Sequence, residues 1–244
     1  AGFTVTTNWQ KFTHTFIAGP LPTNGAIADI VLGFFGPGTV WVDNFLLYED
    51  EDNNPATYPA YAMRPAALQA LIDYKPGVLR LNTGTSTGYW GTDLDDWTRE
   101  EPEVGMQWHS DQGKHIPDDP YKLPSALRMM RDCGGEPWLI VGSFFSEQEW
   151  LGLMEYLAAP YDPTNDTPVA KPYAYRRYMQ GQAAPWTEVF PKIHFEFGCE
   201  LWNPVFVWNF ANGNQNGQFA RHFFDVAQSS PYFTTSVASR LRFM

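Results

Sequence analysis

The chain has 244 residues, and its 16 Lys and Arg against 27 Asp and Glu give a formal net charge of −11 at pH 7. An acidic surface repels polyanions, so nucleic acid and anionic membrane surfaces are not expected as partners. Hydrophobic residues make up 44% and charged residues 18%, which is typical of a folded globular protein and excludes a disordered one. No apolar run approaches the roughly 18 residues of a membrane span, and the first residues do not resemble a signal peptide.

Residues 1–48 are predicted to be β-structure alone. Turns rich in Gly and Pro separate short runs of β-branched and aromatic residues at 3–5, 12–17, 27–35 and 39–48. In the last run the side chains alternate in character, as in a sandwich strand with two differently packed faces. The acidic stretch 49–55 then predicts a domain boundary, with a partial β-sandwich over 1–57 and a second domain over 58–244.

Helix and strand patterns alternate from residue 58 onward. Four helices are predicted: one that begins at Pro65, one over 123–133, one that begins after Ser146, and one over 215–228. Ser146 and Glu149 are predicted to form a capping box at the start of the third. Strands are predicted over 78–82, 138–141 and 193–199, and the stretch 84–122 is expected to be irregular. This order is typical of a parallel sheet covered by helices, in an open doubly wound sheet or in a (β/α) barrel.

The two cysteines are expected to be free thiols. Cys133 precedes the strand near 138–141, and Cys199 ends the neighbouring strand. Opposite ends of a strand of this length lie on the order of 20 Å apart. A disulfide needs Cα atoms within about 7 Å, so the two thiols should not pair.

The segment 193–203 is the strongest candidate for a functional site. With a period of two, one face carries polar residues and the other is apolar; the polar set is His194, Glu196, Gly198 and Glu200, and the apolar set is Ile193, Phe195, Phe197 and Cys199. A glutamate at the carboxyl end of a barrel strand is in the position of a catalytic group. The alternatives are a solvated Glu200 at the strand end and a buried pair formed by Glu196 and His194.

The sequence Gly198-Cys199-Glu200-Leu201-Trp202, after Phe195-Glu196-Phe197, resembles the acid/base motif of clan A retaining glycosidases, usually Trp-Glu-Ile-Gly-Asn-Glu. The stretches 63–80 and 135–141 resemble the α-L-arabinofuranosidases of glycoside hydrolase family fifty-one. Residues 39–48 are similar to the last strand of the carbohydrate-binding-module-like sandwich of those enzymes. The resemblance implies a partial (β/α)8 TIM barrel, about strands two to four, preceded by part of a β-sandwich.

The resemblance also implies a retaining glycoside hydrolase that acts on plant-type polysaccharide or oligosaccharide. Glu200 would protonate the leaving oxygen and later act as the base, while a second carboxylate attacks the anomeric carbon. Arg80 would lie near the nucleophile or the substrate; a structural ion pair in the barrel is the equal alternative.

The chain departs from the family at three points. Cys199 stands where the family has an Asn that contacts the sugar 2-hydroxyl, and Gly142 follows the strand that the family ends with Asn. No residue is assigned as the nucleophile, because Asp225 is the one acidic residue after Glu200 and falls within a predicted helix. For this chain alone, these departures favour the alternative of a non-catalytic carbohydrate-binding or structural protein that retains the glycosidase scaffold. For the parent protein, the presence of Glu196, Glu200, Trp202 and Arg80 favours the hydrolase.

Aromatic side chains are expected on the same face as Glu200, since the stretch after the first barrel strand and the residues after Glu200 both follow strand ends. This set comprises Tyr89, Trp90, Trp97, Trp202 and Trp208. Aromatic rings suit the C–H faces of sugars, so Trp90 and Trp202 are assigned to substrate binding, whereas Trp208 is assigned to packing. Asn203, Glu196, Cys199 and Arg80 complete the substrate-binding set.

No cofactor and no metal are expected. No Gly-rich phosphate loop follows a strand, and the polar cluster at 108–119 matches no compact zinc or calcium spacing. Asp43 is assigned to capping a turn in preference to binding calcium.

The expected partners are a carbohydrate substrate and the remainder of the same protein. Residues 1–48 supply about four strands, where a sandwich typically has about seven. Residues 58–244 supply three strands where a (β/α)8 barrel has eight, so we expect a fragment that forms an open half-barrel. An acidic, Trp-rich chain with a binding module is typical of an extracellular or secreted protein, although relatives in the family also work in the cytoplasm.

Overall fold

The computed structural model describes residues 2–17, 32–42, 65–81, 93–99, 105–109, 114–118, 122–199 and 212–244, and the chain divides into two compact units, Ala1–Leu46 and Leu47–Met244. In the first unit, residues 2–17 and 32–42 contain no strand, so the β-sandwich expected there is not formed by these residues. β-branched and aromatic residues favour strands only where a partner strand supplies hydrogen bonds and a packed face. The predicted domain boundary at 49–55 lies outside the described residues.

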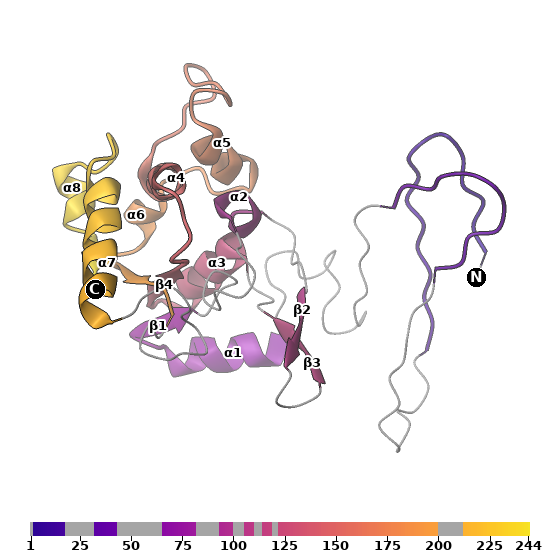
Figure 1. Cartoon of the computed structure of the whole chain (residues 1–244), viewed down its shortest axis with the longest axis horizontal. Helices are drawn as coiled ribbons and strands as arrows, with labels where there is room; N and C mark the ends of the chain where they lie inside the picture. The colour runs from indigo at the N-terminus through magenta and orange to yellow at the C-terminus, as the bar shows by residue number, and fades with distance from the viewer. Residues whose placement is uncertain are drawn as a thin grey trace. The chain divides into compact units, whose positions relative to one another are not determined.

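The second unit contains a four-stranded parallel sheet in the order β1-β4-β5-β6. Its strands are β1 (Val78–Leu81), β4 (Glu136–Val141), β5 (Ile193–Phe197) and β6 (Leu241–Phe243), and every neighbouring pair is parallel. Figure 1 labels two of these strands, β1 and β4, beside the helices of this unit. The three strands predicted in this domain are confirmed. β6 was not predicted, because three residues are too few to show a period.

The predicted helices are confirmed as α1 (Pro65–Tyr74), α3 (Leu123–Cys133), α4 (Glu147–Ala158) and α7 (Gly213–Gln228). Shorter helices that were not predicted are α2 (Leu94–Trp97), α5 (Pro172–Met179), α6 (Trp186–Val189) and α8 (Thr235–Ala238). The expectation of an irregular stretch at 84–122 is wrong, since it contains α2 and a hairpin of antiparallel strands, β2 (Gly105–His109) and β3 (Lys114–Asp118). Within the described residues, no helix is both long and apolar enough to cross a membrane.

Local signals set the helix ends as the sequence predicts. The backbone N–H of Glu149 donates to Ser146 Oγ at 3.3 Å, and the Glu149 carboxylate accepts from the N–H of Ser146 at 2.7 Å, which forms the predicted capping box of α4. α3 ends at Gly134, whose φ of 72° lies in the left-handed region that glycine adopts at little cost.

The hydrophobic core lies on one face of the parallel sheet, between the strands and the helices. Apolar residues of the strands, among them Leu139, Val141 and Phe195, pack in one cluster with residues of α3, α4, α6 and α7. Trp150 of α4 is fully buried, with ring centroids 6.4 Å from Phe195 and 5.9 Å from Phe224. A parallel sheet with helices on one face is the arrangement of part of a (β/α) barrel, in which the other face lines the interior.

Two residues discussed from the sequence, Trp97 and Cys133, belong to this core. Trp97, expected on the face that carries Glu200, is fully buried instead, with its ring in an edge contact 5.8 Å from Phe145. The short helix α2, which was not predicted, turns this side chain inward. Cys133 and Cys199 are both buried, and they form no disulfide, as predicted.

Gly152 marks a close approach of α4 to its neighbours. A Cβ on Gly152 would lie 2.5 Å from Tyr173 Cε2 and 2.6 Å from Leu94 Cδ2. We therefore expect Gly152→Ala to lower the free energy of unfolding by about 1–3 kcal/mol, measured by urea denaturation. Gly217→Ala on α7 is the matched control, because no heavy atom lies within 4 Å of its Cβ position. The control should raise stability by up to about 1 kcal/mol, and equal effects of the two changes would contradict the packing at Gly152.

Candidate functional site

The candidate site lies on the face of the parallel sheet opposite the core. Along β5, Ile193, Phe195 and Phe197 are buried, whereas His194 and Glu196 are partly exposed, which confirms the predicted alternation. Arg80 of β1 and Trp138 of β4 are opposite each other in the strand register and are partly exposed as well. The face of the sheet that would line a barrel interior is therefore polar.

Arg80 and Glu196 form a bidentate ion pair across this face. Arg80 Nε donates to Glu196 Oε2 at 2.7 Å, and Nη2 donates to Oε1 at 2.6 Å. The pair spans β4, which lies between the two strands, and the Arg80 guanidinium lies 5.7 Å from the centroid of the Trp138 ring. The hydrogen bond to Glu196 raises the pKa of Arg80 above its ordinary value, so the guanidinium is a fixed positive charge. The structural ion pair considered for Arg80 is thus present.

Cys199 lies on the polar face, contrary to the prediction from a period of two. Gly198 has a φ of 69°, which interrupts the extended conformation directly after β5. As a result, Cys199 Sγ accepts a hydrogen bond from Arg80 Nη2 at 3.7 Å and does not follow Phe197 into the core. The same interruption means that the face occupied by residue 200 does not follow from strand alternation.

The alternative pair of Glu196 and His194 is wrong. His194 Nε2 lies 2.8 Å from Glu136 Oε2, on the neighbouring strand β4. Glu196 is bonded to Arg80 instead, so the polar face holds two separate pairs. Residues two apart on one strand project side by side, and each finds a partner on another strand.

A cavity of about 910 Å³ opens beside the ion pair, a volume in the range of ligand pockets. Its wall includes Arg80, Trp138 and Glu196 from the sheet. A second wall is formed by α7, where Phe224 and Asp225 line the cavity. The cavity is therefore lined by side chains of both charges and by aromatic rings. Such a lining suits a ligand that carries many hydroxyl groups.

Four residues of the predicted site lie outside the described residues: Glu200, Trp90, Trp202 and Asn203. The structure brings together Arg80, Glu196 and Cys199 from the predicted set. It adds Trp138, which sequence reasoning missed. Trp138 lies opposite Arg80 in the register of β1 and β4, a pairing that follows from the strand order and not from the local sequence.

Within the described part of the chain, no group of three or more His, Cys, Asp or Glu side chains is placed to hold a metal ion. Of the polar cluster at 108–119, Trp108 lies on β2 opposite His115 on β3. The side chains of these two strands are not among those described.

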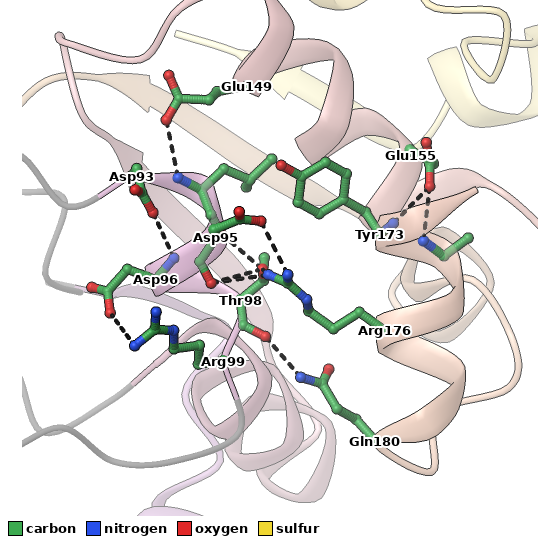
Figure 2. A network of polar contacts seen from close by, with 12 residues as sticks. Asp93, Asp95, Asp96, Thr98, Arg99, Glu149, Glu155, Tyr173, Arg176 and Gln180 are labelled. Atoms are coloured by element: carbon green, nitrogen blue, oxygen red, sulfur yellow. Dashed lines mark hydrogen bonds and ion pairs between the residues drawn. The ribbon is translucent and has the colours of Figure 1, made fainter. Parts of the chain in front are cut away.

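A second polar network joins α2, α4 and α5 and is shown in Figure 2. Glu149 accepts from the N–H of Leu94 at 3.1 Å, so one carboxylate caps both α4 and α2. Arg176 of α5 donates to Asp95 Oδ1 at 3.0 Å and to Thr98 Oγ1 at 2.6 Å. These bonds hold α2 in place, and we assign the network to structure because it does not line the cavity.

Glu155 of α4 caps the start of α5, as Figure 2 also shows. Its Oε1 accepts from the N–H groups of Tyr173 at 2.8 Å and Ala174 at 3.0 Å. Burial raises the pKa of Glu155 above its ordinary value of 4.5, in spite of these bonds. The stability that this group contributes is therefore complete below about pH 4.5 and is lost as the pH rises through the raised pKa.

We expect Glu155→Gln to match the wild type in free energy of unfolding at pH 4 and to exceed it at pH 7, because the amide keeps an acceptor without a buried charge. Glu155→Ala, which leaves two N–H groups without this acceptor, should lose about 1–2 kcal/mol at both pH values. Urea denaturation at the two pH values measures both variants. A Gln variant that loses stability relative to the wild type as the pH rises would contradict this role for Glu155.

Comparison with known proteins finds similarity in structure alone. No family model and no curated protein matches the chain. An α-L-arabinofuranosidase from Thermotoga maritima, in its arabinose complex, is similar with a TM-score of 0.52 and 16% identity over 71% of this chain and 33% of that one. The GH51 arabinofuranosidase of Thermotoga petrophila RKU-1 is similar with a TM-score of 0.51 and 17% identity over 70% and 33% of the two chains.

The GH51 arabinofuranosidase of Xanthomonas axonopodis pv. citri is similar with a TM-score of 0.50 and 15% identity over 70% of this chain and 31% of that one. The chain thus spans about a third of the length of these structures. At such identities the likeness shows a common fold. It confirms, at the level of the fold, the resemblance of part of this chain to family fifty-one arabinofuranosidases.

Proposed function

We propose that the protein is a retaining glycoside hydrolase of the α-L-arabinofuranosidase type, which acts on plant-type polysaccharide or oligosaccharide with Glu200 as general acid and base. The observation that supports this most directly is the charged pair of Arg80 and Glu196 on a glycosidase-like scaffold, beside a cavity of about 910 Å³. In (β/α) barrels, catalytic groups come from the carboxyl ends of the strands. Glu200 follows β5 by three residues.

In the proposed reaction, Glu200 first donates its proton to the glycosidic oxygen as the leaving group departs. A second carboxylate attacks the anomeric carbon, and Glu200 then takes a proton from the water that releases the sugar. Glu196 is not assigned to this second role, because both of its oxygens accept hydrogen bonds from Arg80. Trp138 offers an aromatic face to the C–H groups of a sugar ring, and Trp90 and Trp202 are proposed to do the same.

Hydrolysis of aryl α-L-arabinofuranosides and aryl xylosides by this chain, and by any longer natural form, tests the proposal. Retaining hydrolysis of the arabinofuranoside, with a mechanism-based inhibitor that labels a glutamate, is the expected result. If no form hydrolyses either substrate and no glutamate is labelled, the enzyme proposal fails. Saturable binding of arabino-oligosaccharide without hydrolysis would instead support the non-catalytic carbohydrate-binding alternative.

A further inference from the structure

The turn after β5 is fixed by contacts from two other strands. The N–H of Gly198 donates to the carbonyl of Val141, the last residue of β4, at 2.7 Å. One residue later, the thiol of Cys199 is held by Arg80 of β1 at 3.7 Å. Cys199 is only 5% exposed, so the sulfur side of this contact is buried. β1 and β4 therefore hold Gly198 and Cys199, the two residues that follow β5, in place.

Arg80 Nη2 is the atom that joins the two sides of this turn. It donates to Glu196 Oε1 before the turn and to Cys199 Sγ after it. Arg80 is itself held by the second bond from Nε to Glu196 and by the face of Trp138. A planar guanidinium with two bonds to one carboxylate has little freedom to move, so it is a rigid support for the thiol.

We propose that Arg80 is a positioning residue, which acts through Cys199 to hold the segment that carries Glu200 at the end of β5. This inference rests on the proposed role of Glu200 as the acid/base, and Cys199 precedes Glu200 directly in the chain. A displacement of about 1 Å in a catalytic group can lower the rate about 100-fold. Loss of Arg80 should therefore lower kcat far more than it changes KM, because the acid is misplaced while the cavity remains.

The test compares Arg80→Ala, Cys199→Ala and the double variant with the wild type, by steady-state kinetics and pH–rate profiles. Arg80→Ala is expected to lower kcat about 100-fold. In the pH–rate profile, the limb that reports the ionisation of the general acid should also shift. Because the two residues act as a unit, the double variant should lose no more than Arg80→Ala alone. Arg80→Lys should recover part of kcat. The ammonium group keeps the positive charge, but it cannot bind Glu196 through two bonds and Cys199 at the same time, as the guanidinium does.

Lys171→Ala is the matched control, because it removes a part-buried ion pair of Lys171 with Asp166 at 2.8 Å that does not line the cavity. It should lower stability without changing kcat or the pH profile. Additive losses of Arg80→Ala and Cys199→Ala, or an Arg80→Ala variant that changes KM alone, would overturn the positioning role.

A second measurement does not depend on hydrolysis. Hydrogen–deuterium exchange of the peptide that covers 196–204 should become faster in Arg80→Ala and stay unchanged in Lys171→Ala. Unchanged exchange in Arg80→Ala overturns the inference, whatever the activity. If the wild type proves inactive while this exchange responds to Arg80→Ala, the function proposed for Glu200 fails and the role of Arg80 in fixing the segment is upheld.

Discussion

Glu200→Gln should lower kcat on substrates with poor leaving groups by about 10²–10⁴-fold, the usual contribution of a general acid/base. An amide has nearly the shape of the carboxylic acid but donates no proton to a departing oxygen. A dinitrophenyl arabinofuranoside needs no such proton, so its first step should survive the change and the slow second step should let the glycosyl-enzyme accumulate. The initial burst of dinitrophenol measures this directly, in whichever form of the protein shows hydrolysis.

Glu188→Gln is the matched control for this experiment. Glu188 is an exposed carboxylate on α6 and does not line the cavity, so the same chemical change should leave kcat unaltered. Added azide, which attacks a glycosyl-enzyme without a general base, should restore turnover of the activated substrate to Glu200→Gln alone. A loss of equal size for good and poor leaving groups would remove Glu200 from the role of acid.

Arg177→Met should lower the free energy of unfolding by about 3–5 kcal/mol, a large fraction of the stability of most domains. Arg177 of α5 is fully buried and donates to four carbonyls: those of Tyr156 and Ala159 at 2.6 Å, Gln182 at 3.2 Å and Ala183 at 3.5 Å. The first two belong to the end of α4, where helical carbonyls lack partners within the helix. Each buried carbonyl that loses its donor costs about 1–3 kcal/mol.

The charge of Arg177 also has a cost. Burial lowers its pKa to about 10, so Arg177 keeps its positive charge at neutral pH, but holding that charge costs free energy relative to the unfolded chain, and the bonds to the carbonyls offset this cost. Arg177→Lys should therefore be intermediate, because it keeps the charge but reaches fewer carbonyls. Arg131→Met on the exposed side of α3 is the control, with an expected change within about 0.5 kcal/mol in urea denaturation. Equal losses in Arg177→Met and Arg131→Met would contradict the role of the buried bonds.

The parts of the fold that local chemistry determines were predictable. The capping box at Ser146, the end of α3 at Gly134 and the alternation along β5 each depend on residues close together in the chain. β6 and the β2–β3 hairpin were missed, because each is defined by the strand it pairs with and carries a weak period of its own. In residues 2–17 the prediction failed in the other direction: strands were predicted from strong strand propensity, and the described residues contain none.

Three members of the candidate site, Arg80, Glu196 and Cys199, were singled out from the sequence, but their contacts with one another were not predicted. Arg80 and Glu196 were both singled out, yet their pairing depends on the strand order β1-β4-β5, which no local pattern contains. Cys199 was placed on the wrong face because one left-handed residue, Gly198, reverses the alternation. Where a glycine follows a strand that bears functional residues, the alternation of side chains along the strand should therefore not be used to assign the faces of the residues after it.

The bond between Arg80 and Glu196 has a consequence for the order of folding. The two residues are 116 positions apart in the chain, and β4 has to lie between β1 and β5 before their side chains meet. Contacts of such long range form late, after the chain entropy of closing the intervening segment has been lost. Late contacts slow unfolding and have little effect on the rate of folding. The charged pair that faces the cavity therefore contributes kinetic stability to the sheet after it has assembled.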